Sequence, residues 1–439
     1  MTDLMPRYDD ASIHTEESLL LPREELIPFV EYYFNRRGVY LKQLKHHASF
    51  LYVLEPDVLI RRADQFKNTF RRVLPDSDFY FAVKSNNHPE VARTLIKSGF
   101  GLDVSSGLEM QTALDLKAKE IVFSGPGKTQ GELELAVRNN SRVTVLLDSF
   151  GELERLEKTA AFLEAKVRAG VRLTTNPKGL WRKFGIPPDQ LIEFWQVARA
   201  CPHVSLKGIQ FHTSWNLSAK SQEEFIGFLG ELLSEMPDQL EEHLTFIDIG
   251  GGYWPEQGEW RHPSLASQEM LRKTNKQRHD GSTIHYRYPA EPIEAFAQKI
   301  SRALQLHIFP LTACRIYFEP GRWICNDAMH LLMTVVDRKG ADLVITDAGT
   351  NAVGWERFES DYFPVLNLTR PALTEKPCYI LGALCTPHDV WGFSYFGQDI
   401  RVGDVLMIPT QGAYTYSLRQ NFIKPVPEVA IITTANQHE

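Results

Sequence analysis

The sequence of 439 residues lacks the features that mark several classes of protein. No apolar run reaches the length of a membrane-spanning helix. Residues 1–17 are acidic and polar, without the basic start and apolar core of a signal peptide. The net charge of −7 provides no general basic surface for nucleic acid. We therefore expect a globular protein without a membrane or nucleic-acid partner.

Cysteines are few and scattered along the chain. There are five, an odd number, and no two have the Cys-x-x-Cys spacing of zinc sites and redox pairs. They are Cys201, Cys314, Cys325, Cys378 and Cys385. This pattern argues against a disulfide framework or a metal site and fits the reducing cytoplasm. Internal repeats and low-complexity segments are also absent.

From residue 79 to about residue 318, short apolar runs alternate with amphipathic helical stretches, which is typical of parallel βα units. The predicted strands are 79–83, 101–104, 120–123, 143–147, 166–172, 206–211, 245–249 and 315–318. Eight is the number of strands that closes a (β/α)8 barrel. Residues 255–283 are polar and contain glycine and proline, and they predict a loop insertion after the seventh strand.

The pattern changes after about residue 325, where short strand-like runs follow one another without helical stretches between them. These runs are 331–336, 342–346, 378–381, 405–408 and 429–433. They predict an all-β C-terminal domain. A helix-like stretch at 24–36 precedes the barrel, and we expect it to pack against that domain. The predicted parts are an N-terminal segment at 1–55, the barrel at 56–320 and the β domain at 321–439.

Four polar motifs come directly after predicted barrel strands. Lys84 follows the first strand, His212 the sixth, Gly250-Gly251-Gly252 the seventh and Glu319-Pro320-Gly321-Arg322 the eighth. In a (β/α)8 barrel the carboxyl ends of the strands meet on one rim, where the chemistry takes place. Motifs that are far apart in the sequence are therefore expected to converge.

Each motif alone has an ordinary interpretation. A strand-end lysine usually extends to solvent, three glycines usually form a flexible turn, and a single histidine is usually structural. Together they match one kind of ligand. Burial would lower the pKa of Lys84 so that its amine can form a Schiff base. Glycine N–H groups and Arg322 would bind a phosphate, and Glu319 would pair with a protonated ring nitrogen. An aldehyde cofactor with a phosphate and a pyridine nitrogen uses all of these groups.

Further motifs extend this pattern through nearly the whole chain. They are Ala82-Val83-Lys84-Ser85-Asn86, Gly101 to Ser106, Glu109, Lys183-Phe184-Gly185, Phe211-His212, Asp347-Ala348-Gly349, Gly382 to Cys385 with Asp389, and Gly412-Ala413-Tyr414. With these motifs the chain resembles the fold-type III pyridoxal-phosphate decarboxylases, the ornithine, diaminopimelate and arginine decarboxylase family with an alanine-racemase-like fold. The resemblance implies pyridoxal 5'-phosphate as cofactor, a β domain completed by N-terminal residues, and a head-to-tail homodimer with active sites at the subunit interface.

The resemblance also implies a role for individual residues. Lys84 would hold the cofactor, His212 would stack on its ring and Glu319 would pair with its ring nitrogen. Asp103 and Arg172 would lie near the lysine and the ring. The residues expected around the phosphate are Ser214, Gly251, Gly252, Gly321, Arg322 and Tyr414.

Cys385 would enter the partner's site and donate a proton to the carbanionic carbon of the substrate. A buried small hydrophobe is the alternative interpretation of this cysteine, as a packed aromatic is of Tyr414. Thr386 follows Cys385 where the family often has an acidic residue that contacts the distal amine of a diamino acid. The tentative substrate contacts are Thr386, Asp389 and Arg357.

Two other departures concern the phosphate and the substrate. Thr213-Ser214-Trp215 stands where the family has a phosphate-binding Gly-Ser, and no Arg-Pro pair follows Asp347-Ala348-Gly349. Arg357 would be the equivalent of that arginine at a shifted position. These departures favour an unusual or conjugated amino acid over free ornithine, lysine or diaminopimelate.

An anionic partner such as Glu319 favours a protonated ring nitrogen, which is a strong electron sink and suits the loss of CO2. The sequence therefore predicts a decarboxylase that produces an amine. One alternative is a racemase or epimerase on the same fold. The other is a non-catalytic regulator that keeps the fold, which the retention of Lys84, Glu319 and Cys385 disfavours.

Overall fold

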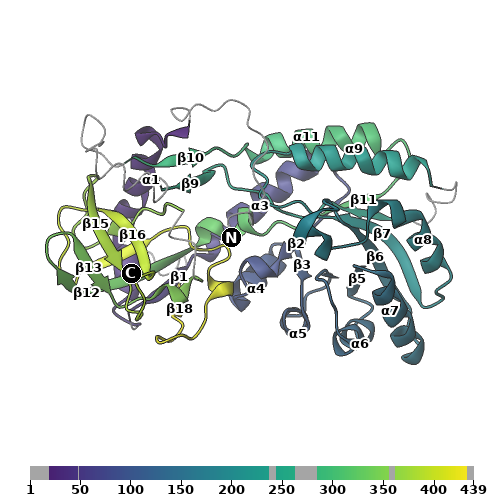
Figure 1. Ribbon diagram of the computed structural model, residues 1–439, viewed down its shortest axis with the longest axis horizontal. Coiled ribbons are helices and arrows are strands. Elements are labelled where there is room, and N and C mark those ends of the chain that lie inside the picture. The colour runs from purple at the N-terminus through teal and green to yellow at the C-terminus, as the bar shows by residue number, and fades with distance from the viewer. Residues whose placement is uncertain (1–18, 48, 237–243, 263–283, 355–360, 433–439) are drawn as a thin grey trace.

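The computed structural model describes residues 19–432 except residue 48 and the segments 237–243, 263–283 and 355–360. Two bodies lie side by side in Figure 1, a barrel surrounded by helices and a separate β domain. The predicted (β/α)8 barrel with a C-terminal all-β domain is confirmed.

The barrel is closed by eight parallel strands in the order β11-β2-β3-β4-β5-β6-β7-β8. They are β2 (Ser77–Ala82), β3 (Gly101–Val104), β4 (Ile121–Phe123), β5 (Val143–Leu147), β6 (Val167–Leu173), β7 (Val204–Phe211), β8 (Phe246–Asp248) and β11 (Arg315–Phe318). Each predicted barrel strand overlaps one of these. The pairing runs around the barrel with a register shift between Ala169 and Gly170 of β6, and it closes where β11 pairs with both β2 and β8.

Helices connect the barrel strands and cover their outer face. They include α3 (Pro56–Val73), α4 (Pro89–Lys97), α5 (Gly107–Asp115), α6 (Gln130–Arg138), α7 (Phe150–Phe162), α8 (Leu191–Arg199), α9 (Lys220–Ser234) and α11 (Ile293–His307). Several begin at a polar cap. Ser149 accepts a hydrogen bond from the backbone N–H of Glu152 at the start of α7. Such caps satisfy backbone N–H groups that would otherwise have no partner.

Apolar side chains fill the part of the barrel interior that lies away from the carboxyl ends of the strands. They are Tyr80, Val122, Leu146 and Phe246, with Tyr317 packed against them. The rings of Phe246 and Tyr317 stack with their centroids 4.5 Å apart. Because alternate residues of a strand share one face, the next inward positions along β8 and β11 are Asp248 and Glu319. The interior therefore changes from apolar to charged toward the carboxyl ends of the strands.

The β domain is an eight-stranded sheet in the order β13-β15-β16-β14-β17-β12-β1-β18. Its strands are β1 (Leu51–Leu54), β12 (Met329–Lys339), β13 (Leu343–Thr346), β14 (Leu366–Asn367), β15 (Glu375–Leu381), β16 (Val390–Phe396), β17 (Val405–Ile408) and β18 (Glu428–Ile431). β1 lies inside this sheet, antiparallel to β12 and parallel to β18. Residues before the barrel thus complete the domain after it, as expected; β14 and β16 were not predicted.

The N-terminal helices α1 (Arg23–Asn35) and α2 (Arg37–Gln43) pack against the same sheet through the apolar side chains of α1. A buried polar cluster links the two helices to the sheet. Glu55 accepts hydrogen bonds from Arg36, from the hydroxyl of Tyr40 at 2.8 Å and from Nε2 of His330 at 2.9 Å. Burial alone would raise the pKa of Glu55, but His330 and Arg36 hold it at about 2.

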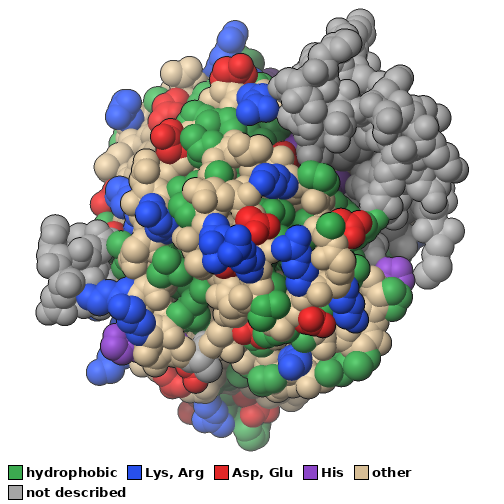
Figure 2. All heavy atoms as spheres, turned by 90° about the vertical axis from the view of Figure 1, so that its left-hand side faces the viewer, with side chains coloured by type: hydrophobic (Ala, Val, Ile, Leu, Met, Phe, Trp, Pro, Cys, Tyr) green, Lys and Arg blue, Asp and Glu red, His purple; other side chains and the backbone are tan. Residues whose placement is uncertain are grey.

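The segment predicted as a loop insertion is partly ordered into strands. β9 (Glu259–Arg261) pairs with β10 (Tyr286–Tyr288), so the prediction of a loop is wrong for 259–261, while 263–283 lie outside the described residues. Figure 2 faces the β-domain end, where basic and acidic side chains are mixed with apolar ones. Among the described helices, none has both the length and the apolar character needed to cross a bilayer.

Candidate active site

Lys84 lies in a short 3-10 turn, Val83–Ser85, at the carboxyl end of β2. Its Nζ donates to Oδ2 of Asp103, on the neighbouring strand β3, at 3.1 Å. Burial acts to lower the pKa of Lys84, but the carboxylates of Asp103 and Glu319 raise it above its usual value. The expectation of a lowered pKa is therefore wrong for the protein alone, because two strands next to β2 each place an anion near the amine.

Glu319 follows β11 and is 1% exposed. Its Oε2 lies 3.8 Å from Nδ1 of His212, and its Oε1 has no hydrogen-bond partner. Burial would raise the pKa of Glu319, but His212 and Lys84 lower it to about 2. Burial lowers the pKa of His212, which therefore stays neutral at pH 7. The site thus holds a buried carboxylate with a lowered pKa and with one oxygen that lacks a protein partner.

The three glycines after β8 bring the ends of three strands together. Gly250 has φ +68°, and a Cβ there would lie 2.7 Å from the carbonyl oxygen of Phe211. A Cβ on Gly251 would lie 2.2 Å from the carbonyl oxygen of Glu319. Gly251 donates its N–H to Nδ1 of His212 at 3.1 Å, so this N–H already has an intramolecular partner. The glycines fix the positions of His212 and Glu319 as well as opening space for a ligand.

Arg322 follows Gly321 and presents an unused donor to the same region. Its Nη1 is buried and has no hydrogen-bond partner. The guanidinium lies over the rings of Trp254, at 4.2 Å, and Tyr414, at 5.0 Å. Burial lowers the pKa of Arg322, yet a guanidinium keeps its charge at pH 7. A buried cation with an unsatisfied N–H is well suited to bind an anion.

Tyr414 comes from the β domain but meets the barrel beside Lys84. Its backbone N–H donates to the carbonyl oxygen of Ser85 at 2.7 Å. The amide of Asn86 donates to the carbonyl oxygen of Gly412 at 2.8 Å. Two hydrogen bonds therefore join the turn that carries Lys84 to the loop that carries Tyr414.

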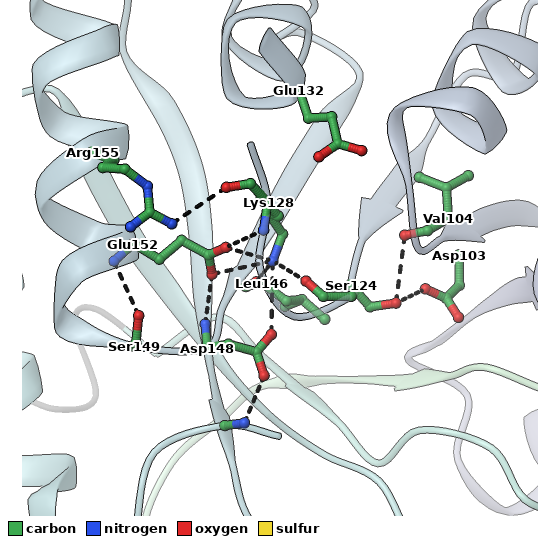
Figure 3. Close-up of polar contacts among 12 residues, drawn as sticks. Asp103, Val104, Ser124, Lys128, Glu132, Leu146, Asp148, Ser149, Glu152 and Arg155 are labelled. Carbon is green, nitrogen blue, oxygen red and sulfur yellow. Dashed lines mark hydrogen bonds and ion pairs between the residues drawn. The ribbon is translucent and has the colours of Figure 1, made fainter. Parts of the chain in front are cut away.

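A second polar network lies beside Asp103 and includes residues that were not predicted (Figure 3). Ser124, at the end of β4, donates its hydroxyl to Oδ1 of Asp103. Lys128 donates to the carbonyl oxygens of Gly125, at 2.7 Å, and Leu146, at 2.6 Å. Its Nζ also lies 3.2 Å from Oε2 of the buried Glu152. Lys128 thus anchors the loop after β4, whose Ser124 orients the partner of Lys84. A lysine within Gly-Pro-Gly-Lys gives no sequence signal of such a role.

The remaining predicted barrel residues lie on the same rim. Arg172, near the end of β6, places its guanidinium 4.7 Å from the ring of Phe184. The hydroxyl of Thr213 accepts a hydrogen bond from Asn216 at 2.8 Å. Ser214 therefore remains the better candidate for a ligand-binding hydroxyl in this turn.

The loop with Cys385 lies in the β domain, and Cys385 is exposed. Asp389 braces this loop, since its Oδ1 accepts from the N–H of Thr350 at 2.7 Å and its Oδ2 from the N–H of Leu384 at 2.6 Å. Both carboxylate oxygens of Asp389 are thus engaged within the domain. Thr386 is partly exposed, and Arg357 lies outside the described residues.

The rim therefore combines an amine, an unpartnered buried carboxylate oxygen and an unpartnered guanidinium N–H. An amine can attach a carbonyl compound covalently, a carboxylate can hold a protonated ring nitrogen, and a guanidinium can bind phosphate. One ligand that carries all three groups would satisfy them together.

Comparisons with known proteins agree with this arrangement. A family model described as "Pyridoxal-dependent decarboxylase, pyridoxal binding domain" matches residues 57–326. The chain is 26% identical over 352 residues to the lysine/ornithine decarboxylase of Selenomonas ruminantium, covering 79% of this chain and 80% of that protein. It is 25% identical over 388 residues to the 2-[(L-alanin-3-ylcarbamoyl)methyl]-2-hydroxybutanedioate decarboxylase of Staphylococcus aureus, covering 82% and 89%.

The fold is similar to the crystal structure of diaminopimelate decarboxylase from Helicobacter pylori complexed with L-lysine. The TM-score is 0.72 at 22% sequence identity, over 90% of this chain and 94% of that one.

Proposed function

The chain belongs to the pyridoxal-dependent decarboxylase family and is a pyridoxal-phosphate-dependent decarboxylase of an amino acid or amino-acid derivative. We propose here which residues perform this reaction and which kind of substrate the enzyme takes. The observation that carries the assignment of residues is the buried carboxylate of Glu319, which stays ionised and has one oxygen without a partner. A buried unpartnered charge is costly unless a ligand of opposite charge completes it.

The residues present fit pyridoxal phosphate. Lys84 would bind the aldehyde group of the cofactor covalently. Arg322 and Tyr414 would hold its phosphate, because the buried Nη1 of Arg322 has no protein partner. Gly252, Gly321 and Ser214 would line the phosphate as well. The N–H of Gly251 is taken by His212, so Gly251 would contribute mainly by leaving room.

The ring would be surrounded by side chains from the ends of four strands. Glu319 would keep a proton on the ring nitrogen, and neutral His212 would stack on the ring face. Asp103 would keep Lys84 oriented through its 3.1 Å hydrogen bond, and Arg172 would lie on the far side of the rim. Pyridoxal phosphate, when bound, supplies an electron sink for the charge left on the α-carbon as CO2 departs.

We assign the final proton transfer to Cys385. The bond from the α-carbon to the carboxylate breaks and releases CO2, and the Sγ proton of Cys385 then replaces it on that carbon to give an amine. Cys385 is exposed, and Asp389 braces its loop, as expected of a group that reaches into a neighbouring subunit. The working form would be a head-to-tail homodimer with shared sites. All five cysteines are unpaired, which supports a cytoplasmic location.

For the substrate we propose a conjugated or otherwise unusual amino acid instead of a free diamino acid. Thr386 follows Cys385, so a distal ammonium group would lack a charged partner there. Such a charge-assisted hydrogen bond contributes about 1.5–3 kcal/mol. The Staphylococcus aureus relative, named for an amide-linked substrate, is consistent with this class.

The test is a CO2-release assay over lysine, ornithine, diaminopimelate and amide-linked conjugates of 2,3-diaminopropionate. We expect a conjugate to have the highest kcat/KM, and Thr386→Glu to raise kcat/KM for the diamino acids about ten- to a hundredfold. Preference of the unmodified enzyme for a free diamino acid would refute the substrate assignment. Loss of optical activity without CO2 release would instead identify a racemase.

A further inference from the structure

Asp248 is a buried carboxyl group that the proposed chemistry does not use. It is the last residue of β8, is 0% exposed and points into the barrel beside Glu319. Its Oδ1 accepts from the backbone N–H of Gly250 at 2.9 Å, while its Oδ2 is buried without a partner. Glu319 shows the same pattern, with Oε1 buried and unpartnered. Two adjacent carboxyl groups thus each have one unsatisfied oxygen.

A single proton would satisfy both oxygens. The two side chains are close enough for a hydrogen bond once one of them carries a proton. β8 and β11 are paired, and Glu319 donates its backbone N–H to the carbonyl oxygen of Gly250 at 2.8 Å, so the two strand ends are held together. Two ionised carboxylates within hydrogen-bonding reach of each other in a buried site would repel each other strongly.

The charges around Asp248 decide which group carries that proton. Lys84, Arg172 and Arg322 are cations of this rim, and the carboxylates beside Lys84 are those of Asp103 and Glu319. Among the described residues, none forms an ion pair with Asp248; the groups that face it are Glu319, Asp103 and the hydroxyls of Tyr253 and Tyr317. Burial and the charge of Glu319 raise the pKa of Asp248, whereas that of Glu319 is lowered.

We propose that Asp248 is a neutral carboxylic acid in the folded protein and donates a hydrogen bond from Oδ2 to Oε1 of Glu319, whose other lone pairs stay open to the ring nitrogen of the cofactor. Asp248 is then a positioning residue that keeps Glu319 an ionised, weakly basic acceptor. The consequence for catalysis rests on the proposed function. A weakly basic Glu319 would leave the proton on the ring nitrogen of the cofactor, and the protonated ring would remain a strong electron sink. A neutral carboxylic acid that serves as a donor at pH 7 is a recognised device of active sites.

The first test is infrared spectroscopy of the protein without cofactor at pH 7. The carbonyl band of a protonated carboxylic acid should be present in the wild type and absent in Asp248→Asn. Glu319→Gln should also lose it, since Asp248 no longer faces an anion. Asp148→Asn is the matched control: Asp148 also follows a barrel strand, but it lies 3.8 Å from Lys128. That variant should keep the band.

The second test compares the conservative variant with an isosteric one that lacks the donor. The amide of Asp248→Asn should replace the donated hydrogen bond and keep the dissociation constant of pyridoxal phosphate within about threefold. Asp248→Leu can neither donate to Glu319 nor accept the N–H of Gly250, so it should weaken binding by at least about ten- to a hundredfold, the value of one hydrogen bond to a charged group.

A wild type without the band, a band that survives in Asp248→Asn, or equal losses of cofactor affinity in both variants would each overturn the proposal. The infrared result does not depend on catalysis. If the band is assigned to Asp248 but no pyridoxal phosphate binds, the carboxyl pair stands and the proposed function fails.

Discussion

The backbone N–H of Tyr414 donates to the carbonyl oxygen of Ser85 at 2.7 Å, so the β domain is hydrogen-bonded to the residue next to Lys84. Asn86 adds a second link through the carbonyl oxygen of Gly412. The amine that would attach the cofactor and the tyrosine that would contact its phosphate belong to different domains. Their separation is therefore fixed by this short interface and not by either domain alone.

Removing the Asn86 link should weaken the protein and the cofactor site together. Asn86→Ala leaves the buried carbonyl of Gly412 without its donor, and we expect a loss of about 1–3 kcal/mol in the free energy of unfolding. Pyridoxal phosphate should also bind more weakly. In the control Asn140→Ala, a partly exposed asparagine loses a solvent-exposed hydrogen bond to the carbonyl oxygen of Lys166, and the change should stay within about 0.5 kcal/mol. Denaturant unfolding measures the stability of both variants. Equal losses of stability would argue against a special role for Asn86.

Lys84 should carry the cofactor covalently. The purified protein should be yellow, and borohydride reduction followed by peptide mapping should place the label on Lys84. Lys84→Ala should lose both colour and turnover, because no other amine would take its place on the rim. Lys183→Ala serves as a control. A label on any other lysine would contradict the assignment.

Glu319 should determine the reaction and not the fold. Glu319→Gln is nearly isosteric but removes the anion, so the ring nitrogen should lose its proton more readily. We expect the variant to bind cofactor while kcat for CO2 release falls about 10²–10³-fold, typical of removing one preorganised electrostatic group. Steady-state kinetics at saturating cofactor measure this. Normal turnover in the variant would disprove the electron-sink argument.

Cys385 and Lys84 should act across a subunit boundary. Lys84→Ala and Cys385→Ala homodimers should each have little activity. A mixed dimer places both lesions in one site and leaves the other intact, so activity should recover toward half of the wild-type value. The measurement is CO2 release after subunit exchange, with native mass spectrometry to confirm heterodimers. Confirmed heterodimers that stay inactive would return Cys385 to a structural role.

Stability at acid pH should depend on Glu55. Its pKa of about 2 in the folded protein lies below the ordinary value of 4.5, so its stabilising contribution is complete above pH 4.5. That contribution is lost as the pH falls from about 4.5 to about 2. The stability difference between wild type and Glu55→Gln should therefore be largest near pH 6 and shrink across this interval. Urea unfolding at several pH values checks it; a difference that is independent of pH would refute the linkage.

The barrel could be predicted because its strands are apolar runs of three to eight residues separated by amphipathic helices. The β domain was predicted less completely. β14 is only two residues long, and β16 contains Gly392 and Ser394 within an aromatic run. The pairing of β1 joins residues 275–281 positions apart with β12 and 377 positions apart with β18, for which local patterns carry no information.

The candidate site, too, was only partly predictable from the sequence. Lys84, His212 and Glu319 come together because each directly follows a strand of one barrel. The raised pKa of Lys84 was not foreseen, because it depends on how Asp103 and Glu319 are placed around the amine. Asp248 did carry a signal, a carboxyl group within the apolar run Ile247-Asp248-Ile249, whereas the role of Lys128 emerges only from its contacts with Gly125, Leu146 and Glu152.

The position of β1 inside the C-terminal sheet affects how the chain folds during synthesis. Leu51–Leu54 are fully buried in the finished sheet, yet their neighbour β12 begins about 275 residues later. At about 5–20 residues per second, the strand waits roughly 14–55 s on the ribosome with both edges unpaired. The barrel can close in the meantime, because β11 ends before β12 begins. A nascent-chain chaperone that binds extended apolar segments should therefore contact residues 51–54 until the β domain is made.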